Sequence, residues 1–341
     1  MSQRADSVAH DAADQAQVLA ENAQYLIATA ARAPSVHNSQ PWQFQVTAQA
    51  VELWSDPRRK LRTDPIGREM LISCGAALYG LRLAVRSLGY QPAVKLLPDP
   101  ARLRLLARVT IGAASPVNNL ERQLLAAVPH RHTHRGQFAA GPLPAGLLAG
   151  LQHDALAEGA RLAFIENGLP YERLAQIVAD AARRGDHDPR ARSEVRKWTR
   201  DPSSTARDGV PAVALAAQVP ARIPHGRLRQ RDFDLGRGLA MLPGGADGDE
   251  VPPAATAILL TSGDRRADWL CAGQALQRLL LRAASQWVFA RLHTQPIEDP
   301  VARDLIRERL TLVSNPQMLL QFGRAHTAAS TARRPPGELT P

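Results

Sequence analysis

The sequence predicts an α+β protein that consists of two similar halves fused in one chain. Apolar residues recur at helical spacing in several segments, and short strand-like segments lie between them. Residues 75–89 and 273–287 are identical at six of fifteen positions without a gap, which indicates an internal repeat. The length of 341 residues also matches roughly two domains of about 150 residues each. One alternative stays open, because two helices rich in Ala and Leu can resemble each other by composition alone.

The first half is predicted to span residues 1–128. Its long apolar helix is closed by Gly89. Asn118 or Asn119 can cap its last helix, which Pro129 stops. The expected elements are helices over 14–32, 68–89 and 117–128 and strands over 42–47, 50–55, 92–97 and 103–111, of which the first two strands form a hairpin.

The second half is predicted to span residues 129–330, with a tail at 331–341. The chain beyond residue 325 is rich in Pro and Arg, which predicts loose order. The expected elements are helices over 144–157, 169–184, 266–292 and 301–310 and strands over 160–165, 255–262 and 317–323.

Residues 185–254 are predicted to form a lid or another functional insertion. They are rich in Arg, Asp, Pro and Gly and have weak periodicity, and the stretch is too long for an ordinary connection. Four of its side chains could bring charge and one aromatic ring near a site: Arg192, Arg196, Trp198 and Arg207.

Composition and charge exclude several classes of protein. Lys and Arg outnumber Asp and Glu by 42 to 32, which favours either an anionic ligand or a basic surface from codon bias. The arginines are spread along the chain and aromatic residues make up only 4%, so nucleic acid is not expected as a partner. Two cysteines exclude a disulfide scaffold. The polar N-terminus and the absence of a long apolar run predict a cytoplasmic protein without a membrane partner.

The loop over residues 33–44 (APSVHNSQPWQF) concentrates neutral hydrogen-bonding side chains. Ser35, Asn38 and Gln40 can match the alternating N–H and C=O groups on the edge of a planar heterocycle. The loop has no carboxylate, so it is poorly suited to acid–base hydrolysis. The alternative is a turn in which Asn and Ser satisfy the local backbone.

Residues 129–138 (PHRHTHRGQF) predict an anion site. Arg131, Thr133 and Arg135 alternate along an extended loop, and two guanidiniums with a hydroxyl can surround a phosphate. Three histidines alternate with them and also suggest a metal site. We expect no metal, because the arginines repel a cation and neither a carboxylate nor a cysteine joins the histidines. His132 is therefore grouped with the anion site.

Two further motifs lie in the second half. HTQPIEDP comes directly after the long predicted helix and contains Pro296, Ile297 and Glu298, for which an ordinary helix exit is the alternative. In MLLQFGR, residues 318–324, a predicted strand is followed by Gly323 and Arg324.

These motifs resemble the flavin site of the FMN-dependent nitroreductase superfamily. PSxxNSQPW, which starts at Pro34, is similar to its flavin-contacting loop, and RxTxR at 131–135 is similar to its RxSxR phosphate segment. PIE resembles the segment beside the flavin N5 atom, and Arg324 the basic residue after the last strand. APSVHNSQPW, LLISCGAAL, RDFD, DWLCAGQALQRLLL and NPQMLLQFG are similar to segments of the Acg family within that superfamily.

The resemblance implies a nitroreductase-like fold in which one chain corresponds to a homodimer, with one flavin site between the halves. It implies non-covalent FMN, NAD(P)H as electron donor and a small acceptor such as a nitro-aromatic or a quinone. The chain itself could be a monomer or a homodimer. No side chain is expected to be catalytic, because the flavin carries the chemistry.

The implied cofactor-binding residues are Pro34, Ser35, Asn38 and Gln40 at the ring, Pro296, Ile297 and Glu298 at N5, and Arg131, His132, Thr133, Arg135 and Arg324 at the phosphate. The alternative function is to bind or sequester FMN with little turnover, under the insertion.

Overall fold

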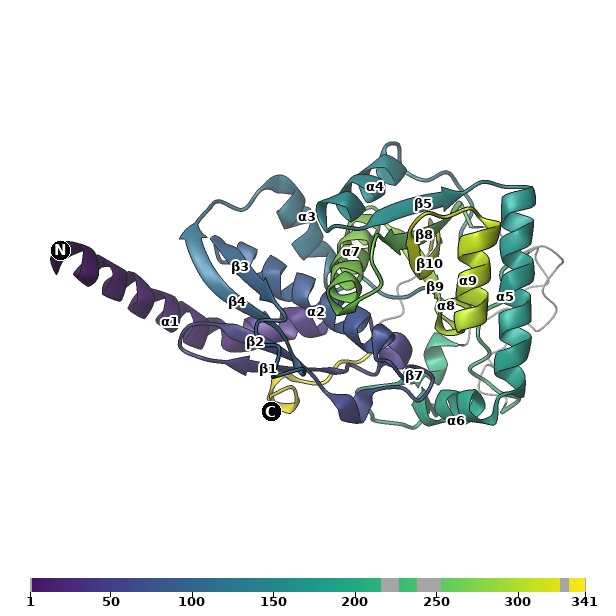
Figure 1. Cartoon of the computed structure of the whole chain (residues 1–341), viewed down its shortest axis with the longest axis horizontal. Helices are drawn as coiled ribbons and strands as arrows, with labels where there is room; N and C mark the ends of the chain where they lie inside the picture. The colour runs from purple at the N-terminus through teal and green to yellow at the C-terminus, as the bar shows by residue number, and fades with distance from the viewer. Residues whose placement is uncertain (1, 216–226, 238–252, 326–330, 341) are drawn as a thin grey trace.

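Two four-stranded antiparallel sheets, each with a long helix beside it, form the body of the protein (Figure 1). The computed structural model describes residues 2–215, 227–237, 253–325 and 331–340. The strand orders are β1-β2-β4-β3 in the first half and β5-β8-β10-β9 in the second. This arrangement confirms the predicted α+β class and the two similar halves.

The first half contains α1, a hairpin whose first strand lies at the edge of the sheet, and the first long central helix. Trp42 and Phe44 of the hairpin are fully buried in the core that α1 and the central helices share. Its elements are α1 (Ser2–Ala31), β1 (Trp42–Val46), β2 (Val51–Ser55), α2 (Arg68–Ser87), β3 (Tyr90–Leu96), β4 (Leu105–Ala114) and α3 (Asn119–Ala127). The N-terminal part of α1 extends away from the sheets (Figure 1).

The second half places its sheet between the central helix α7 and the helices α5 and α9 (Figure 1). Its elements are α4 (Leu147–Ala157), β5 (Arg161–Ile165), α5 (Leu169–His187), α6 (Pro189–Trp198), β6 (Thr199–Arg200), β7 (Val210–Pro211), β8 (Ala255–Thr261), α7 (Arg266–Ser285), β9 (Val288–His293), α8 (Gln295–Glu298), α9 (Pro300–Arg309) and β10 (Asn315–Arg324). No helix in the described part of the chain is long and apolar enough to cross a membrane.

The central helices α2 and α7 pack directly on each other. A Cβ atom on Gly75 would lie 2.2 Å from the backbone oxygen of Leu270, and a Cβ on Gly273 would lie 2.0 Å from that of Ile72. Only glycine permits this approach. Both helices have 20 residues, and each glycine is the eighth residue of its helix. The packing therefore follows the internal repeat that the sequence predicts.

The predicted helix over 266–292 is wrong at its C-terminal end. The helix α7 ends at Ser285, and β9 begins at Val288, which pairs with Arg324 of β10. The turn between them places Trp287 at a φ of 56°, a left-handed conformation without glycine or proline. Because the turn contains neither glycine nor proline, the sequence gives no local signal that the helix ends there.

Two predictions of weak structure are also wrong. Residues 189–198 of the expected insertion form the helix α6, which Asp188 caps by accepting a hydrogen bond from the backbone N–H of Arg190 (2.8 Å). At the C-terminus, Leu339 is fully buried and its oxygen accepts a hydrogen bond from the backbone N–H of Phe44 (2.7 Å). The remainder of the predicted insertion includes residues outside the described ranges, and the division of the halves at residue 128 stays a prediction.

Candidate cofactor-binding site

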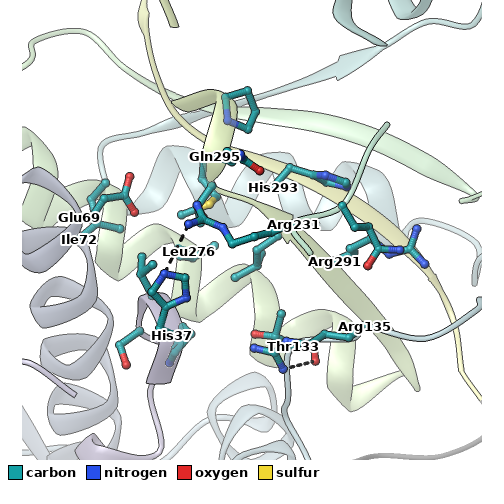
Figure 2. A pocket seen from close by; sticks show the side chains of 18 of the residues that line it. His37, Glu69, Ile72, Thr133, Arg135, Arg231, Leu276, Arg291, His293 and Gln295 are labelled. Atoms are coloured by element: carbon teal, nitrogen blue, oxygen red, sulfur yellow. Dashed lines mark hydrogen bonds between the residues drawn. The ribbon is translucent and has the colours of Figure 1, made fainter. Parts of the chain in front are cut away.

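One pocket lies where the two halves meet, and three of the predicted motifs line it (Figure 2). It encloses about 830 Å³ of empty space, part of it open to solvent. The loop after α1 contributes Pro34 and Ser35, the RxTxR segment contributes Thr133 and Arg135, and the PIE motif contributes Pro296. Its apolar lining comes from both central helices and from β10: Ile72, Leu276 and Met318.

The loop after α1 has a strained backbone. His37, Asn38 and Gln40 have φ angles of 54°, 55° and 50°, although none of them is glycine. Strain of this kind is retained where the surrounding structure fixes it, often at binding sites. Here the backbone N–H of Gln40 donates to Oγ of Ser35 (2.9 Å), which closes the loop.

Asn38 and Gln40 are buried, but they do not line the pocket. The Asn38 amide donates to the oxygens of Gly209 (3.1 Å) and Ala332 (3.0 Å). The Gln40 amide donates to the oxygen of Arg207 (2.8 Å). Both side chains thus join the loop to distant parts of the chain, and their contact with a flavin ring stays a prediction.

Arg131 and His132 of the RxTxR segment do not line the pocket, but Arg131 is buried with most of its guanidinium unpaired among the described residues. It is 6% exposed, and one nitrogen donates to the backbone oxygen of Arg32 (3.1 Å). Nε and Nη1 are buried without a hydrogen-bond partner among the described residues. Burial lowers the pKa of Arg131 to about 10, and the charges of Arg32 and Arg135 act in the same direction. A buried cation in this state is costly unless an anion joins it.

The rest of the RxTxR segment is held against β9. Thr133 forms an isolated parallel bridge with Ala290, and the backbone N–H of His134 donates to the oxygen of Ala290 (2.9 Å). Arg135 lines the pocket, and burial lowers its pKa to about 10. His132 is buried with its ring 4.3 Å from that of Phe289, and burial lowers its pKa to about 4.

The three histidines of this segment do not converge on a metal site. Within the ranges that the structure covers, no group of three or more His, Cys, Asp or Glu side chains is placed to hold a metal ion. The rings instead pack on aromatic neighbours: His130 stacks on Trp287, and His134 stacks on Phe138.

The PIE motif forms the short helix α8, and its members have different environments. Pro296 lines the pocket, whereas Ile297 packs in the core with α5 and α9. Glu298 accepts a hydrogen bond from Arg231 (2.6 Å), and both side chains are largely buried. Burial acts to raise the pKa of Glu298, but the charge of Arg231 helps to bring it below its ordinary value.

Arg231 brings the predicted insertion to the pocket. A second nitrogen of its guanidinium lies 3.4 Å from Nε2 of His37, as Figure 2 shows. Burial, followed by the charge of Arg231, lowers the pKa of His37 to about 3, so its ring is neutral. Phe233 also lines the pocket, edge-on to His37. The RDFD motif, residues 231–234, thus brings a charge and an aromatic ring of the insertion to the pocket. The four side chains proposed there, Arg192, Arg196, Trp198 and Arg207, do not line the pocket.

Glu69 carries the only carboxylate among the described residues that line the pocket. Its Oε1 contacts the guanidinium of Arg68, and its Oε2 is buried with no hydrogen-bond partner in the described ranges. Burial raises the pKa of Glu69 to about 8, although Arg68 acts in the opposite direction. Sequence patterns did not single out this residue, because it lies in an otherwise apolar helix.

Arg324 does not line the pocket. Its Nε donates to the backbone oxygen of Pro142 (2.8 Å). Arg333 of the C-terminal segment approaches Arg131, since both donate to the backbone oxygen of Arg32, at 3.5 and 3.1 Å. Sequence analysis missed Arg333, because it lies in a Pro- and Arg-rich tail with no periodic pattern.

Comparison with known proteins places the chain in a family. A protein of Mycobacterium tuberculosis that is provisionally named an NAD(P)H nitroreductase is 34% identical over 308 residues, or 90% of this chain and 86% of that protein. The provisionally named NAD(P)H nitroreductase acg of the same organism is 29% identical over 318 residues, or 91% and 92% of the two chains. The chain belongs to the Acg family of nitroreductase-like proteins. No protein-family profile matches this Acg-family chain.

Solved nitroreductase structures align with part of this Acg-family chain. A nitroreductase with bound FMN from Bacteroides fragilis has 12% identity and a TM-score of 0.37 over 62% of this chain and 93% of that one. The FMN-dependent nitroreductase NfnB from Mycobacterium smegmatis, in complex with NADPH, has 15% identity and a TM-score of 0.40 over 65% and 99%.

Proposed function

We propose that this Acg-family chain is an FMN-dependent oxidoreductase of nitroreductase type. It takes electrons from NAD(P)H and passes them to a small acceptor such as a nitro-aromatic or a quinone. The observation that carries this proposal is the convergence of Pro34, Ser35, Thr133, Arg135 and Pro296, from both halves, on one pocket. The names of the mycobacterial relatives favour a reductase over a protein that only sequesters FMN.

Two arginines of the RxTxR segment fit the phosphate group of FMN. Arg131 is buried and has two nitrogens without a partner among the described residues, and Arg135, which is half-buried, lines the pocket. Guanidiniums bind phosphate oxygens by charge-assisted hydrogen bonds, which are among the strongest in proteins. Thr133 adds a hydroxyl group from the same segment. These residues would hold the phosphate, and His132 would support the segment from its place on Phe289.

The apolar lining fits a planar ring system. Ile72, Leu276 and Met318 offer side chains without hydrogen-bonding demands. Pro296 stands at the same pocket, where it would limit the orientations that a ring can adopt. The bound flavin would supply the electron transfer, and the protein would bind it, orient it and restrict water. We expect the chain to act in the cytoplasm, as a monomer or a homodimer.

Reconstitution and turnover test the proposal. The purified chain, incubated with FMN and desalted, should retain close to one FMN per chain, measured as acid-released flavin. With NADH or NADPH and a nitro-aromatic or quinone acceptor, it should oxidise the nucleotide in a flavin-dependent reaction. Arg131→Ala should lose most of the bound FMN and serves as the control. A chain that retains no FMN contradicts the cofactor, and retained FMN without turnover by either nucleotide favours sequestration.

A further inference from the structure

The C-terminal segment, residues 331–340, packs across the first half of the protein beside the buried cations. The backbone N–H of Arg334 donates to Oε1 of Gln40 (2.9 Å), and the oxygen of Ala332 accepts a hydrogen bond from Asn38 (3.0 Å). Leu339, fully buried, anchors the other end of the segment against Phe44. The segment thereby holds Arg333 at the end of α1.

Arg333 uses its hydrogen-bond donors on backbone oxygens around the end of α1. Nε donates to Ala31 (3.1 Å), Nη2 to Ala33 (3.2 Å) and Nη1 to Thr331 (2.9 Å). Ala33 directly precedes Pro34 and Ser35, which line the pocket. The carbonyl end of a helix attracts cations, so one arginine here could be a simple helix cap.

A cap does not explain how many cations gather at this place. Arg131 and Arg333 both donate to the backbone oxygen of Arg32, at 3.1 and 3.5 Å, so their guanidiniums lie close together. The charges of Arg32, Arg131 and Arg135 add to the effect of burial, and together they hold the pKa of Arg333 well below its ordinary value. Among the residues that the structure describes, none of these four arginines forms an ion pair with a carboxylate. Like charges repel each other strongly where burial limits their contact with water, as at Arg131, and a dianion nearby would relieve that repulsion.

We propose that Arg333 is a specificity-determining residue for the phosphate group of the cofactor and acts through its charge. The inference rests on the proposed function, because it takes FMN as the ligand. Arg131 has free donors for the phosphate oxygens, whereas those of Arg333 are already used on the backbone. Arg333 therefore raises the positive potential at the phosphate without contacting it. Its selective effect falls on ligands that carry the phosphate dianion, and riboflavin, which lacks it, serves as the comparison.

The test compares the binding of FMN and riboflavin to the full apo chain. Arg333→Gln removes the charge and should weaken FMN binding by about tenfold, a change of about 1.4 kcal/mol. The affinity of the variant for riboflavin should stay within about twofold of the wild-type value. Arg333→Lys keeps the charge and should retain most of the FMN affinity. Arg334→Gln is the matched control, since Arg334 faces Glu338, Asp56 and Asp208 as well as Arg59.

Hydrogen exchange at the amides of Arg334 and Phe44, which donate to Gln40 and Leu339 across the contact, reports whether the C-terminal segment stays docked in each variant. FMN affinity that falls in Arg333→Gln alone, with the segment docked and riboflavin unaffected, supports the proposal. An equal loss for FMN and riboflavin, a loss that follows undocking, or no loss at all overturns it. Wild-type chain that fails to bind FMN contradicts the proposed function instead, so the two failures are distinct.

Discussion

Gly75 and Gly273 lie against each other across the contact between α2 and α7, and a Cβ on Gly273 would come within 2.8 Å of the Cα of Gly75. The contact is reciprocal: Gly75 meets Leu270, and Gly273 meets Ile72, which holds the equivalent position in the other helix. Reciprocal contacts of this kind define a two-fold interface between identical subunits. Here both sides of the contact belong to one chain, so a contact of the kind found between the subunits of a homodimer lies in the core of this chain.

Replacing Gly75 by Ala tests how much stability depends on this approach. The added methyl group meets the backbone oxygen of Leu270 at 2.2 Å, so the helices must separate. We expect the free energy of unfolding to fall by about 3 kcal/mol, at the upper end for an overpacked core. Urea unfolding followed by circular dichroism measures the change.

Gly150→Ala is the matched control, because Gly150 also lies within a helix, α4. The atoms nearest to a Cβ there belong to the Arg282 side chain, the closest at 3.1 Å; that side chain is paired with Asp154 and has to move by only a few tenths of an ångström. The gain in helix propensity is at most about 1 kcal/mol, so stability should stay similar or rise. Equal stabilities of Gly75→Ala and Gly150→Ala would contradict the close contact as a source of stability.

Local sequence patterns predicted most of the helices and strands, because their apolar spacing and caps are local properties. Asn118 is an example: its side chain and that of Glu121 form the capping box that starts α3. The convergence of distant motifs on one pocket has another origin. Spacing alone does not bring Ser35 and Arg135 together, and that expectation came from resemblance to a family.

The parts that the sequence did not predict depend on long-range contacts. The turn at Trp287 adopts a left-handed conformation without a glycine, so it is held by its surroundings. Leu339 is the buried anchor of a tail whose composition suggests disorder, and one apolar residue is too weak a local signal. Glu69 is buried near Glu298 and Arg231, and Arg333 lies near Arg32 and Arg131; these partners are far away in the sequence.

Arg131→Gln should weaken FMN binding by about ten- to a hundredfold and affect riboflavin little. The variant removes up to two charge-assisted hydrogen bonds, each of which contributes on the order of 1.5–3 kcal/mol. Arg324→Gln is the control, since Arg324 bonds the oxygen of Pro142 and does not line the pocket. Fluorescence titration of the apo chain measures the affinities. Wild-type protein that binds riboflavin and FMN equally well would exclude a phosphate site at these arginines.

Glu69→Gln should change the pH dependence of stability in a defined direction. The pKa of Glu69 is about 8 in the folded protein, against an ordinary value of 4.5. Between these values the folded protein holds a proton that the unfolded chain releases, so stability falls as pH rises. This group contributes at most about 1.4 kcal/mol per pH unit. Since Gln does not titrate, the variant should gain stability relative to wild type as pH rises.

Urea unfolding of both proteins at pH 5, 6.5 and 8 gives the difference at each pH. Only the difference is informative, because buried histidines such as His293, whose pKa is lowered by burial to about 4, titrate in both proteins. Arg68 keeps its hydrogen bonds to Gln317 in the variant, so its own burial stays compensated. A difference that is constant from pH 5 to pH 8 would show that Glu69 is ionised in the folded protein throughout.

Arg231→Gln tests whether the insertion restricts access to the pocket. Arg231 joins residues 227–237 to Glu298 by a largely buried ion pair, and the same guanidinium approaches His37. Without that pair, we expect the segment to hold less firmly to α8 and the pocket to become more accessible. NAD(P)H oxidation by the FMN-loaded protein should then rise, as should quenching of flavin fluorescence by iodide.

Arg237→Gln is the control, because Arg237 lies in the same segment and does not line the pocket. FMN content is measured first for each variant. If Arg231→Gln retains FMN and its turnover and quenching match those of the control, Arg231 does not restrict access. Residues 227–237 then do not act as a lid over the pocket.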